Sequence, residues 1–391
     1  MYFAARLAAL IIYVLVLFVV CISISNTKNR KKAAALLTVY VVILSGMGYF
    51  FVPHSGADLS RILVIMHTYA KQDVFGIIES MLRATTPGSV LYYWIIGKFG
   101  NDHLLPAISG FITFFVCFSI LRSLLIREDG RIAPTDVAVA LFLFMSRGLL
   151  MQSISNIRTP MSLALAAWCI YQEFYNGKKL KSLILPYTLS ASLHLLGVVV
   201  LFYRVGYSLI ERGGSRIKRI NRWVCAMGFG VCAIIVGWKY VAATVQKARN
   251  YIVAAVTGTG YEYFWEKALC VITWLVLCYV VYFFCRVYRY TQKNGLADET
   301  SHKTKKLIEY LAPLMGVDIV IMFIEFSTFQ RLNWYLSMLL LPLVACTLRE
   351  ARLAGEAHVK VFHTNLLIAS ASTLFLACAR GDLCSLKFFG G

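Results

Sequence analysis

The sequence predicts an all-α protein that crosses a membrane many times, and three observations support this fold class. Of the 391 residues, 59% are hydrophobic and only 15% are charged, so one water-soluble core could not enclose all of the apolar side chains. Windows of about 18 or more residues with almost no charge recur along the whole chain, and this is the length that a membrane-spanning helix needs. No large polar block separates these windows, so we expect residues 1–391 to form a single integral membrane domain. We expect a bundle of about 10–13 helices, because helices satisfy their backbone hydrogen bonds within lipid.

The apolar windows predict the membrane-spanning helices in order along the chain. In the first window, the positive charges of "NTKNRKK" follow the apolar residues, and no signal-peptide cleavage site is evident. We therefore expect a membrane-spanning helix whose amino end lies outside. The expected spans are residues 3–25, 33–53, 104–126, 134–150, 158–176, 223–243, 266–286, 307–325, 333–348 and 361–379.

Lysine and arginine gather in short runs between these spans, and the runs predict the orientation of the chain. They are residues 28–32, 122–131, 178–181, 212–222, 286–306 and 349–360. Cytoplasmic loops of membrane proteins are rich in lysine and arginine, so we expect all of these runs on the cytoplasmic side. The net charge of +20 then reflects orientation and contact with lipid headgroups. The sequence has no nucleic-acid-binding motif, so membrane lipids and not nucleic acid are the expected partners of this charge.

Two segments do not fit a simple alternation of spans. Residues 51–103 form an outer segment, in which we expect short amphipathic or re-entrant helices. Residues 182–210 lie between two basic runs and are too few for two full spans, which need about 40 residues. We therefore expect a pair of short helices that enter the membrane and return, with "LSASLHLLG" at the apex. This places His194 deep in the protein.

The eleven cysteines do not predict a metal site or a disulfide framework. Most of them lie singly within apolar spans, as Cys117 and Cys346 do, where cysteine behaves as a small hydrophobic residue. The sequence contains no CxxC pair, no Cys/His ligand spacing and no aspartate-rich motif such as DxD. We expect neither a metal ion nor a cofactor.

Polar and charged residues from four distant stretches are expected at the outer end of the bundle. An ionisable group near lipid is costly unless it is paired or faces a wet cavity. A set of such groups at one depth therefore suggests a shared polar cavity. The members of this set are Asp58, Arg61, Arg147, Gln152, Asn156, Arg158, His194, Glu325, Gln330, Arg331 and Asn333.

Several of these residues also have a purely structural interpretation. Asp58 and Arg61 could form a pair on a helix surface, and Asp58 could cap a helix. His194 could be a core histidine whose hydrogen bonds are satisfied, and Arg331 could extend to the lipid headgroups. Arg158 differs from them, because a cation at the start of a helix opposes the helix dipole. That position favours a functional role for Arg158.

The residue types suit the transfer of a sugar from a lipid-linked diphosphate. The planar fork of arginine binds phosphate oxygens and stabilises the charge that builds on a departing diphosphate. A single carboxylate or histidine can take the proton from a sugar hydroxyl, and an inverting transfer needs only that one base. Asp58 and His194 are both candidates for the base.

The same stretches resemble the EpsG family of bacterial exopolysaccharide proteins and, more broadly, the Wzy-type O-antigen and capsule polymerases. The resemblance extends in order from Gly48 to Leu340. It rests on "ADLSR", "SNIRTPMSLALAAW", "SASLHLLG" and "TFQRLNWYLS". On this basis we carry over the family's functional positions to Asp58, Arg61, Asn156, Arg158, His194 and Arg331.

The resemblance implies a glycosyltransferase in the bacterial plasma membrane that polymerises repeat units carried on undecaprenyl diphosphate. The active site would face the extracytoplasmic side, and a GT-C-like arrangement of helices is one architecture that would suit it. Arg158 and Arg331 would bind the diphosphate. The expected partners are the lipid-linked oligosaccharide, membrane lipids, a flippase and a chain-length regulator.

Two other functions remain open from the sequence. A transporter of polyprenyl-linked glycans would favour internal repeats and charges near the middle of the membrane. We find no convincing repeat, although Asp318 lies within an expected span. A glycan ligase or acyltransferase on the same outer face would use similar residues and differ in its product.

Overall fold

The protein is an all-helical bundle in the computed structural model, which describes residues 2–53, 58–126, 132–211, 264–324 and 326–379. These residues form fifteen α-helices and one short 3-10 helix, η1, and no strand. The expected all-α fold class is therefore confirmed. The elements are α1 (Tyr2–Asn26), α2 (Arg30–Tyr49), α3 (Asp58–Ala70), α4 (Val74–Arg83), α5 (Pro87–Gly97), α6 (Leu104–Ile126), α7 (Pro134–Met145), α8 (Leu149–Ser155), α9 (Arg158–Phe174), η1 (Leu180–Leu183), α10 (Ile184–Leu193), α11 (Leu195–Glu211), α14 (Phe264–Lys293), α15 (Glu299–Ile324), α16 (Phe326–Ala354) and α17 (Glu356–Ala379).

Most of the expected spans correspond to long apolar helices, but the expected spans 158–176 and 307–325 fall on α9 and α15, which are not among the helices long and apolar enough to cross a membrane. Six of the described helices are long and apolar enough to cross a membrane, namely α1, α2, α6, α14, α16 and α17, and a seventh span results if α7 and α8 count as one. The bounds of α6 coincide with the expected span 104–126. The expected span 223–243 lies outside the described residues. A multi-pass membrane protein is thus confirmed by helix length and composition.

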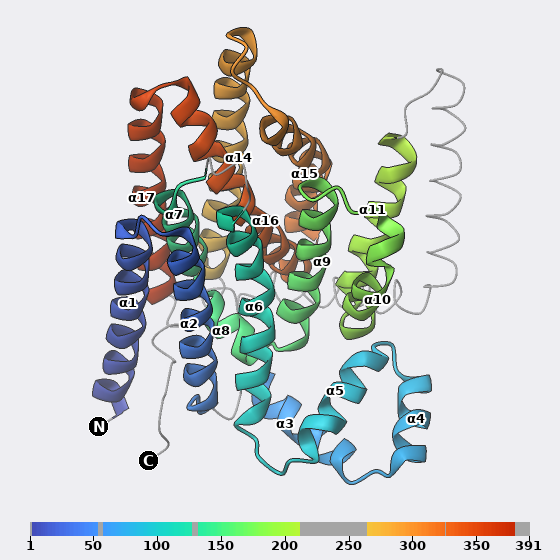
Figure 1. Ribbon diagram of the computed structural model, residues 1–391. Coiled ribbons are helices and arrows are strands. Elements are labelled where there is room, and N and C mark those ends of the chain that lie inside the picture. Colours follow the sequence, from blue (N-terminus) through green and yellow to red (C-terminus); the bar gives the residue numbers. More distant parts are fainter. Residues whose placement is uncertain (1, 54–57, 127–131, 212–263, 325, 380–391) are drawn as a thin grey trace.

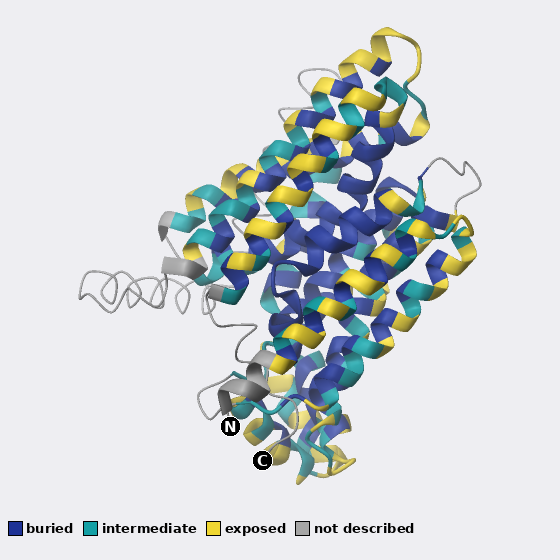
Figure 2. Cartoon of the chain, turned by 90° about the vertical axis from the view of Figure 1, so that its left-hand side faces the viewer, coloured by how far each residue is buried: buried dark blue, intermediate teal, exposed yellow. Residues whose placement is uncertain are grey.

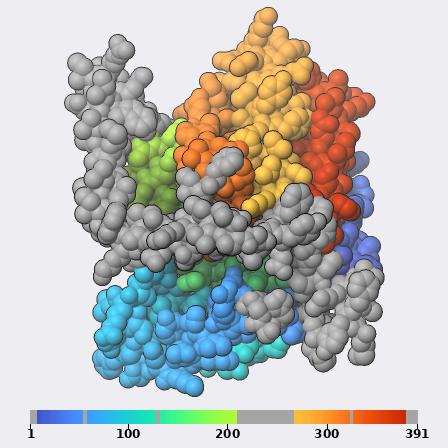
Figure 3. Space-filling model, turned by 180° about the vertical axis from the view of Figure 1, so that it is seen from behind, coloured from blue at the N-terminus to red at the C-terminus, as the bar shows by residue number. Residues whose placement is uncertain are grey.

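The two ends of the bundle differ in structure. The long helices run side by side, and α3, α4 and α5 form a layer across one end (Figure 1). Seen from behind, this layer lies below α14, α15 and α17 (Figure 3). We call this the layer end. The opposite end carries the turns after α1, α14 and α16, where the basic runs 28–32, 286–306 and 349–360 lie, and we call it the basic end.

Helix α16 is the centre of the bundle. It is buried over almost its whole length, whereas α1 and α17 expose much of their surface (Figure 2). It packs against α6, α7, α9, α14, α15 and α17. Polar residues lie at both of its ends, with Asn333 and Ser337 toward the layer end and Arg349 and Glu350 toward the basic end. A buried helix can carry such residues only where neighbouring helices supply hydrogen-bond partners.

Two breaks interrupt helices inside the bundle. Helices α7 and α8 are bent by 60° at residues 146–148, where Gly148 adopts a left-handed conformation (φ 69°) that glycine tolerates without a steric penalty. Helices α10 and α11 pack against each other and meet at His194, whose backbone is extended. The second break coincides with the apex expected for the helical pair 182–210.

Candidate functional site

A small polar pocket lies where the α7–α8 break meets α14 and α16. Its cavity volume is about 20 Å³. We call it the Arg147 pocket, and its polar side chains are Arg147, Gln152, Thr273, Gln330, Asn333 and Ser337. All of them are neutral except Arg147, so the pocket has the character of a site for an anionic group.

Arg147 is a buried cation held by neutral groups. Its side chain is in the break between α7 and α8, and the residue is only 5% exposed. The guanidinium donates hydrogen bonds to the hydroxyl of Ser337 and, over 3.3 Å, to the carbonyl of Thr273. Its Nε–H has no hydrogen-bond partner among the described residues, and no ion pair forms between Arg147 and any described carboxylate. Burying a charge in this way is costly unless a counter-charge arrives.

Hydrogen bonds within the pocket fix the orientation of its polar side chains. Asn333 Nδ2 donates to the carbonyl of Cys270 over 3.2 Å, and the hydroxyl of Ser337 donates to the carbonyl of Asn333 over 2.6 Å. On the other wall, Asn156 Nδ2 donates to Gln152 Oε1 over 2.8 Å. The lining is therefore organised before any ligand arrives, which reduces the entropy lost on binding.

The structure brings some of the sequence-predicted site residues together and leaves others apart. Arg147, Gln152, Gln330 and Asn333 share the Arg147 pocket. Glu325 lies outside the described residues. The remaining predicted residues do not line this pocket, namely Asp58, Arg61, Asn156, Arg158, His194 and Arg331.

Asp58 and Arg61 form an ion pair on the surface of the α3–α5 layer. The guanidinium of Arg61 donates to the carboxylate of Asp58 within the first turn of α3, and their side chains are 73% and 42% exposed, respectively. A solvent-exposed pair of this kind contributes little to stability. The carboxylate thus stays accessible at the amino end of α3.

His194 occupies the break between α10 and α11 and caps the second helix. Its Nδ1 accepts a hydrogen bond of 3.1 Å from the backbone N–H of Leu196. In the neutral imidazole this bond requires the proton on Nε2. The break is tied to α9, because the hydroxyls of Ser162 and Ser190 each donate to the other residue's carbonyl, over 2.8 and 2.7 Å. Ser162 is one turn after Arg158 and Ser190 one turn before His194, so the starts of α9 and α11 lie side by side.

Arg158 follows a residue with a strained backbone. Ile157 has φ 39°, and it is the one non-glycine residue with a positive φ in the described part of the chain. Branched residues rarely adopt this conformation, which costs of order 1–3 kcal/mol and often occurs at functional sites. The half-buried Arg158 begins α9 directly after it.

Arg331, also half-buried, lies on α16 beside Gln330 and forms no ion pair with a described carboxylate.

Tyr93 on α5 is a site candidate that the sequence did not reveal. It belongs to the aromatic segment "SVLYYWIIGKF", which resembles the aromatic belts of many membrane proteins. In the structure Tyr93 is 2% exposed, and its hydroxyl has no hydrogen-bond partner among the described residues. Burial raises the pKa of this hydroxyl, the positive charge of Arg158 lowers it, and the negative charge of Asp58 raises it further. Tyr93 therefore lies within electrostatic reach of both residues, which begin different helices.

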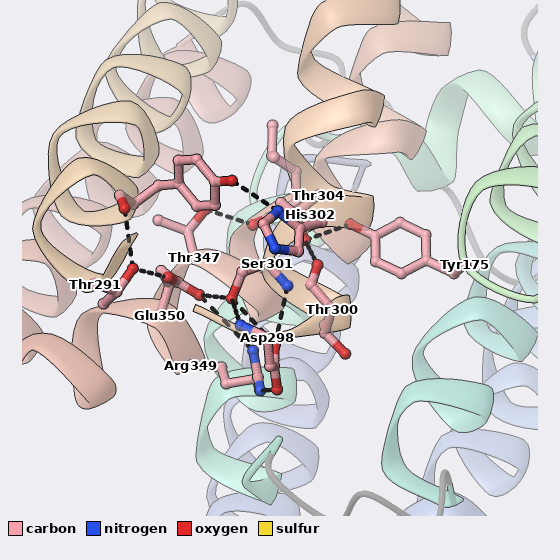
Figure 4. A network of polar contacts seen from close by, with 12 residues as sticks. Tyr175, Thr291, Asp298, Thr300, Ser301, His302, Thr304, Thr347, Arg349 and Glu350 are labelled. Carbon is pink, nitrogen blue, oxygen red and sulfur yellow. Dashed lines mark hydrogen bonds and ion pairs between the residues drawn. The ribbon is translucent and has the colours of Figure 1, made fainter. Parts of the chain in front are cut away.

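At the basic end, buried arginines form ion pairs with carboxylates. Arg349, only 1% exposed, donates to the carboxylate of Asp298, and Glu350 accepts hydrogen bonds from Thr291 and Ser301 (Figure 4). Likewise, the buried Arg204 pairs with Glu173 over 2.8 Å, and the exposed Arg352 pairs with the buried Asp136. The buried Arg349 and Arg204 are thus neutralised by carboxylates, whereas Arg147 has no described carboxylate as partner.

One buried acid lies outside both the Arg147 pocket and the ion pairs of the basic end. Asp318 is 0% exposed on the interior face of α15, and neither carboxylate oxygen has a hydrogen-bond partner in the described ranges. Within those same ranges, no group of three or more His, Cys, Asp or Glu side chains is placed to hold a metal ion.

The fold and these polar clusters define a multi-pass helical membrane protein. Comparison with protein families goes further: the model of the EpsG family matches residues 64–354, which is well over half of the chain, so this protein belongs to the EpsG family. Membership links it to exopolysaccharide biosynthesis. No curated protein and no solved structure matches the chain.

Proposed function

We propose that this protein is a glycan polymerase that acts on lipid-linked repeat units. It would transfer a growing chain from undecaprenyl diphosphate to a hydroxyl of the next lipid-linked repeat. The observation that carries this proposal is the buried Arg147, whose pocket contains no described carboxylate and is lined by preorganised neutral donors. A phosphate oxygen of the diphosphate, which is about as large as the one water molecule that this cavity can hold, supplies the counter-charge that such a site lacks.

The orientation follows from the distribution of lysine and arginine. Because the described basic runs gather at the basic end, that end is the cytoplasmic one, and the layer end with its candidate residues is extracytoplasmic. The amino end of α1 lies at the layer end and is outside in this arrangement.

The transfer step uses cationic and basic side chains in separate roles. The bond between the anomeric carbon and the diphosphate oxygen breaks, and its electron pair stays with the diphosphate. The acceptor hydroxyl oxygen forms the new bond to that carbon, and its proton passes to Asp58. Arg147 and Arg331 stabilise the charge on the departing diphosphate. His194 is the alternative base, but its Nδ1 is already used to cap α11.

Reconstituted protein tests the proposal directly. Purified protein in liposomes is given undecaprenyl-diphosphate-linked repeats extracted from the producing cells, and the length of the lipid-linked glycan is measured. We expect lengthening by the wild type and a loss of about 100-fold or more in Arg147→Gln, the size of effect seen when an oxyanion donor is removed. Arg83→Gln is the control, because Arg83 pairs with Glu79 on the exposed α4, and it should keep full activity.

Other products would overturn this proposal. Movement of the lipid-linked glycan between leaflets without lengthening would indicate a transporter, and a capped chain of unchanged length would indicate a ligase or acyltransferase. Wild-type activity in Arg147→Gln would remove the pocket from the mechanism.

A further inference from the structure

Helix α5 joins the α3–α5 layer to the bundle. It packs against α3, α6 and α10. Gly88, near its start, is so close to α10 that an added Cβ would lie 2.2 Å from the hydroxyl of Ser192, two residues before His194. Gly97, at the end of α5, is similarly close to α3, because an added Cβ would lie 2.8 Å from the side chain of Ala70. The position of α5 is therefore fixed on both sides.

Two adjacent tyrosines on α5 have opposite hydrogen-bonding states. The hydroxyl of Tyr92 is paired with the hydroxyl of Ser109 on α6 at 2.7 Å. The hydroxyl of Tyr93 is also buried and has no partner among the described residues. An unsatisfied buried polar group costs about 1–3 kcal/mol, so its retention calls for an explanation.

The charges around Tyr93 distinguish its surroundings from the Arg147 pocket. Asp58 contributes a carboxylate, which accepts hydrogen bonds but repels phosphate, and Arg158 contributes a cation. A phenol can both donate and accept a hydrogen bond. Donor, acceptor and carboxylate together match a sugar hydroxyl better than they match a diphosphate.

We propose that the junction of α3, α5 and α10 is a second subsite, in which Tyr93 hydrogen-bonds a hydroxyl of the acceptor glycan. This inference rests on the proposed function and adds that the diphosphate and the acceptor sugar are bound at two different places. The Arg147 pocket takes the diphosphate, and the Tyr93 subsite positions the sugar whose hydroxyl is next to Asp58. Tyr93 is a substrate-positioning residue in this arrangement.

A binding experiment with two lipids tests the subsite apart from catalysis. The probes are bare undecaprenyl diphosphate and undecaprenyl-diphosphate-linked oligosaccharide extracted from the producing cells, each titrated against protein in nanodiscs. We expect Tyr93→Phe to bind the bare lipid as the wild type does and to lose about 5–10-fold in affinity for the glycan-bearing lipid, the worth of one hydrogen bond.

Tyr92→Phe is the matched control. It removes the same atom from the neighbouring residue, so it should lower thermal stability by breaking the bond to Ser109 while keeping the affinity for both lipids. Tyr93→Phe should melt no lower than the wild type, because its hydroxyl has no described partner to lose.

Each alternative result has a distinct meaning. Equal affinity of wild type and Tyr93→Phe for the glycan-bearing lipid would overturn the subsite and leave the polymerase proposal standing. An equal loss for both lipids would show that Tyr93 contacts phosphate and would overturn the sugar assignment. A wild-type protein that binds neither lipid would overturn the proposed function itself.

Discussion

Arg147 donates a hydrogen bond to the hydroxyl of Ser337, a residue 190 positions further along the chain. The contact joins the α7–α8 break to the central helix α16, whose other end carries Arg349. The two arginines are both almost fully buried. Only Arg349 has a described carboxylate as partner, so equivalent substitutions at the two positions should have opposite effects.

Replacing Arg147 with methionine should separate stability from function. The substitution removes an uncompensated buried charge and fills the space with an apolar chain, so we expect Arg147→Met to be as stable as the wild type or about 1–4 kcal/mol more stable. Polymerisation should fall at least about 100-fold. Thermal unfolding in detergent and the liposome assay measure the two effects. A clear loss of stability would indicate that Arg147 is structural.

Replacing Arg349 with methionine should unfold the basic end. The substitution leaves Asp298 and the fully buried Glu350 without their cation, and breaking a buried pair in this way costs about 3–5 kcal/mol. We expect a markedly lower melting temperature, measured beside Arg147→Met. If Arg349→Met melts as the wild type does, the network of Figure 4 is not an important source of stability.

Stability should fall in acid through Asp298. Burial acts to raise the pKa of Asp298, but hydrogen bonds from Arg349 and Ser301 and the charge of Arg349 outweigh burial, so the folded-state pKa lies below its ordinary value. The stabilisation is therefore complete above the unfolded-state pKa of about 3.9 and is lost as the pH falls through the folded value. Melting curves from pH 7 to pH 3 should show a smaller decline in Asp298→Asn than in the wild type. An equal decline in both would exclude Asp298 as the source.

The α10–α11 break depends on a glycine. A Cβ at Gly197 would lie 2.5 Å from the carbonyl oxygen of Ser190 and 2.6 Å from the hydroxyl of Ser162, so Gly197→Ala must push α11 away. We expect a loss of about 1–3 kcal/mol, as for overpacking elsewhere. Gly206→Ala on the same helix is the control: it meets nothing within 4 Å and should stabilise by up to about 1 kcal/mol. Equal stability of the two variants would contradict the close approach.

His194 and Asp58 can be distinguished as bases by conservative substitutions. Asparagine is a favourable residue for capping a helix, so His194→Asn should preserve the cap on α11 while removing the imidazole. If Asp58 is the base, we expect His194→Asn to keep at least about a tenth of the activity and Asp58→Asn to lose about 100-fold or more, the usual contribution of a general base. The reverse pattern in the polymerisation assay would make His194 the base.

Much of the fold was predictable because its causes are local. Helices α1, α2 and α6 follow from uninterrupted apolar windows, since a chain in lipid must satisfy its backbone hydrogen bonds within each helix. The break at His194 followed from the shortness of the segment 182–210. Arg147 and Gln152 were predicted site residues because a polar side chain within an apolar stretch needs a polar neighbour.

The rest of the candidate site depends on how distant helices fit together. The wall that α14 adds to the Arg147 pocket, with Thr273 and Cys270, has no distinguishing pattern in the sequence. That the buried hydroxyl of Tyr93 lacks a described hydrogen-bond partner becomes evident only once α5 is packed against its neighbours.

The sequence by itself determined that this is a multi-pass helical protein, where several of its membrane-spanning helices lie, and which residues are polar in an apolar setting. Only the tertiary structure decided that Arg147 is buried without a described carboxylate while Arg349 is paired, and that the hydroxyl of Tyr93 is buried without a described partner. The physical reason is that lipid and backbone hydrogen bonding act on each helix separately, whereas the packing of helices within lipid depends on the fit of side chains far apart in the chain.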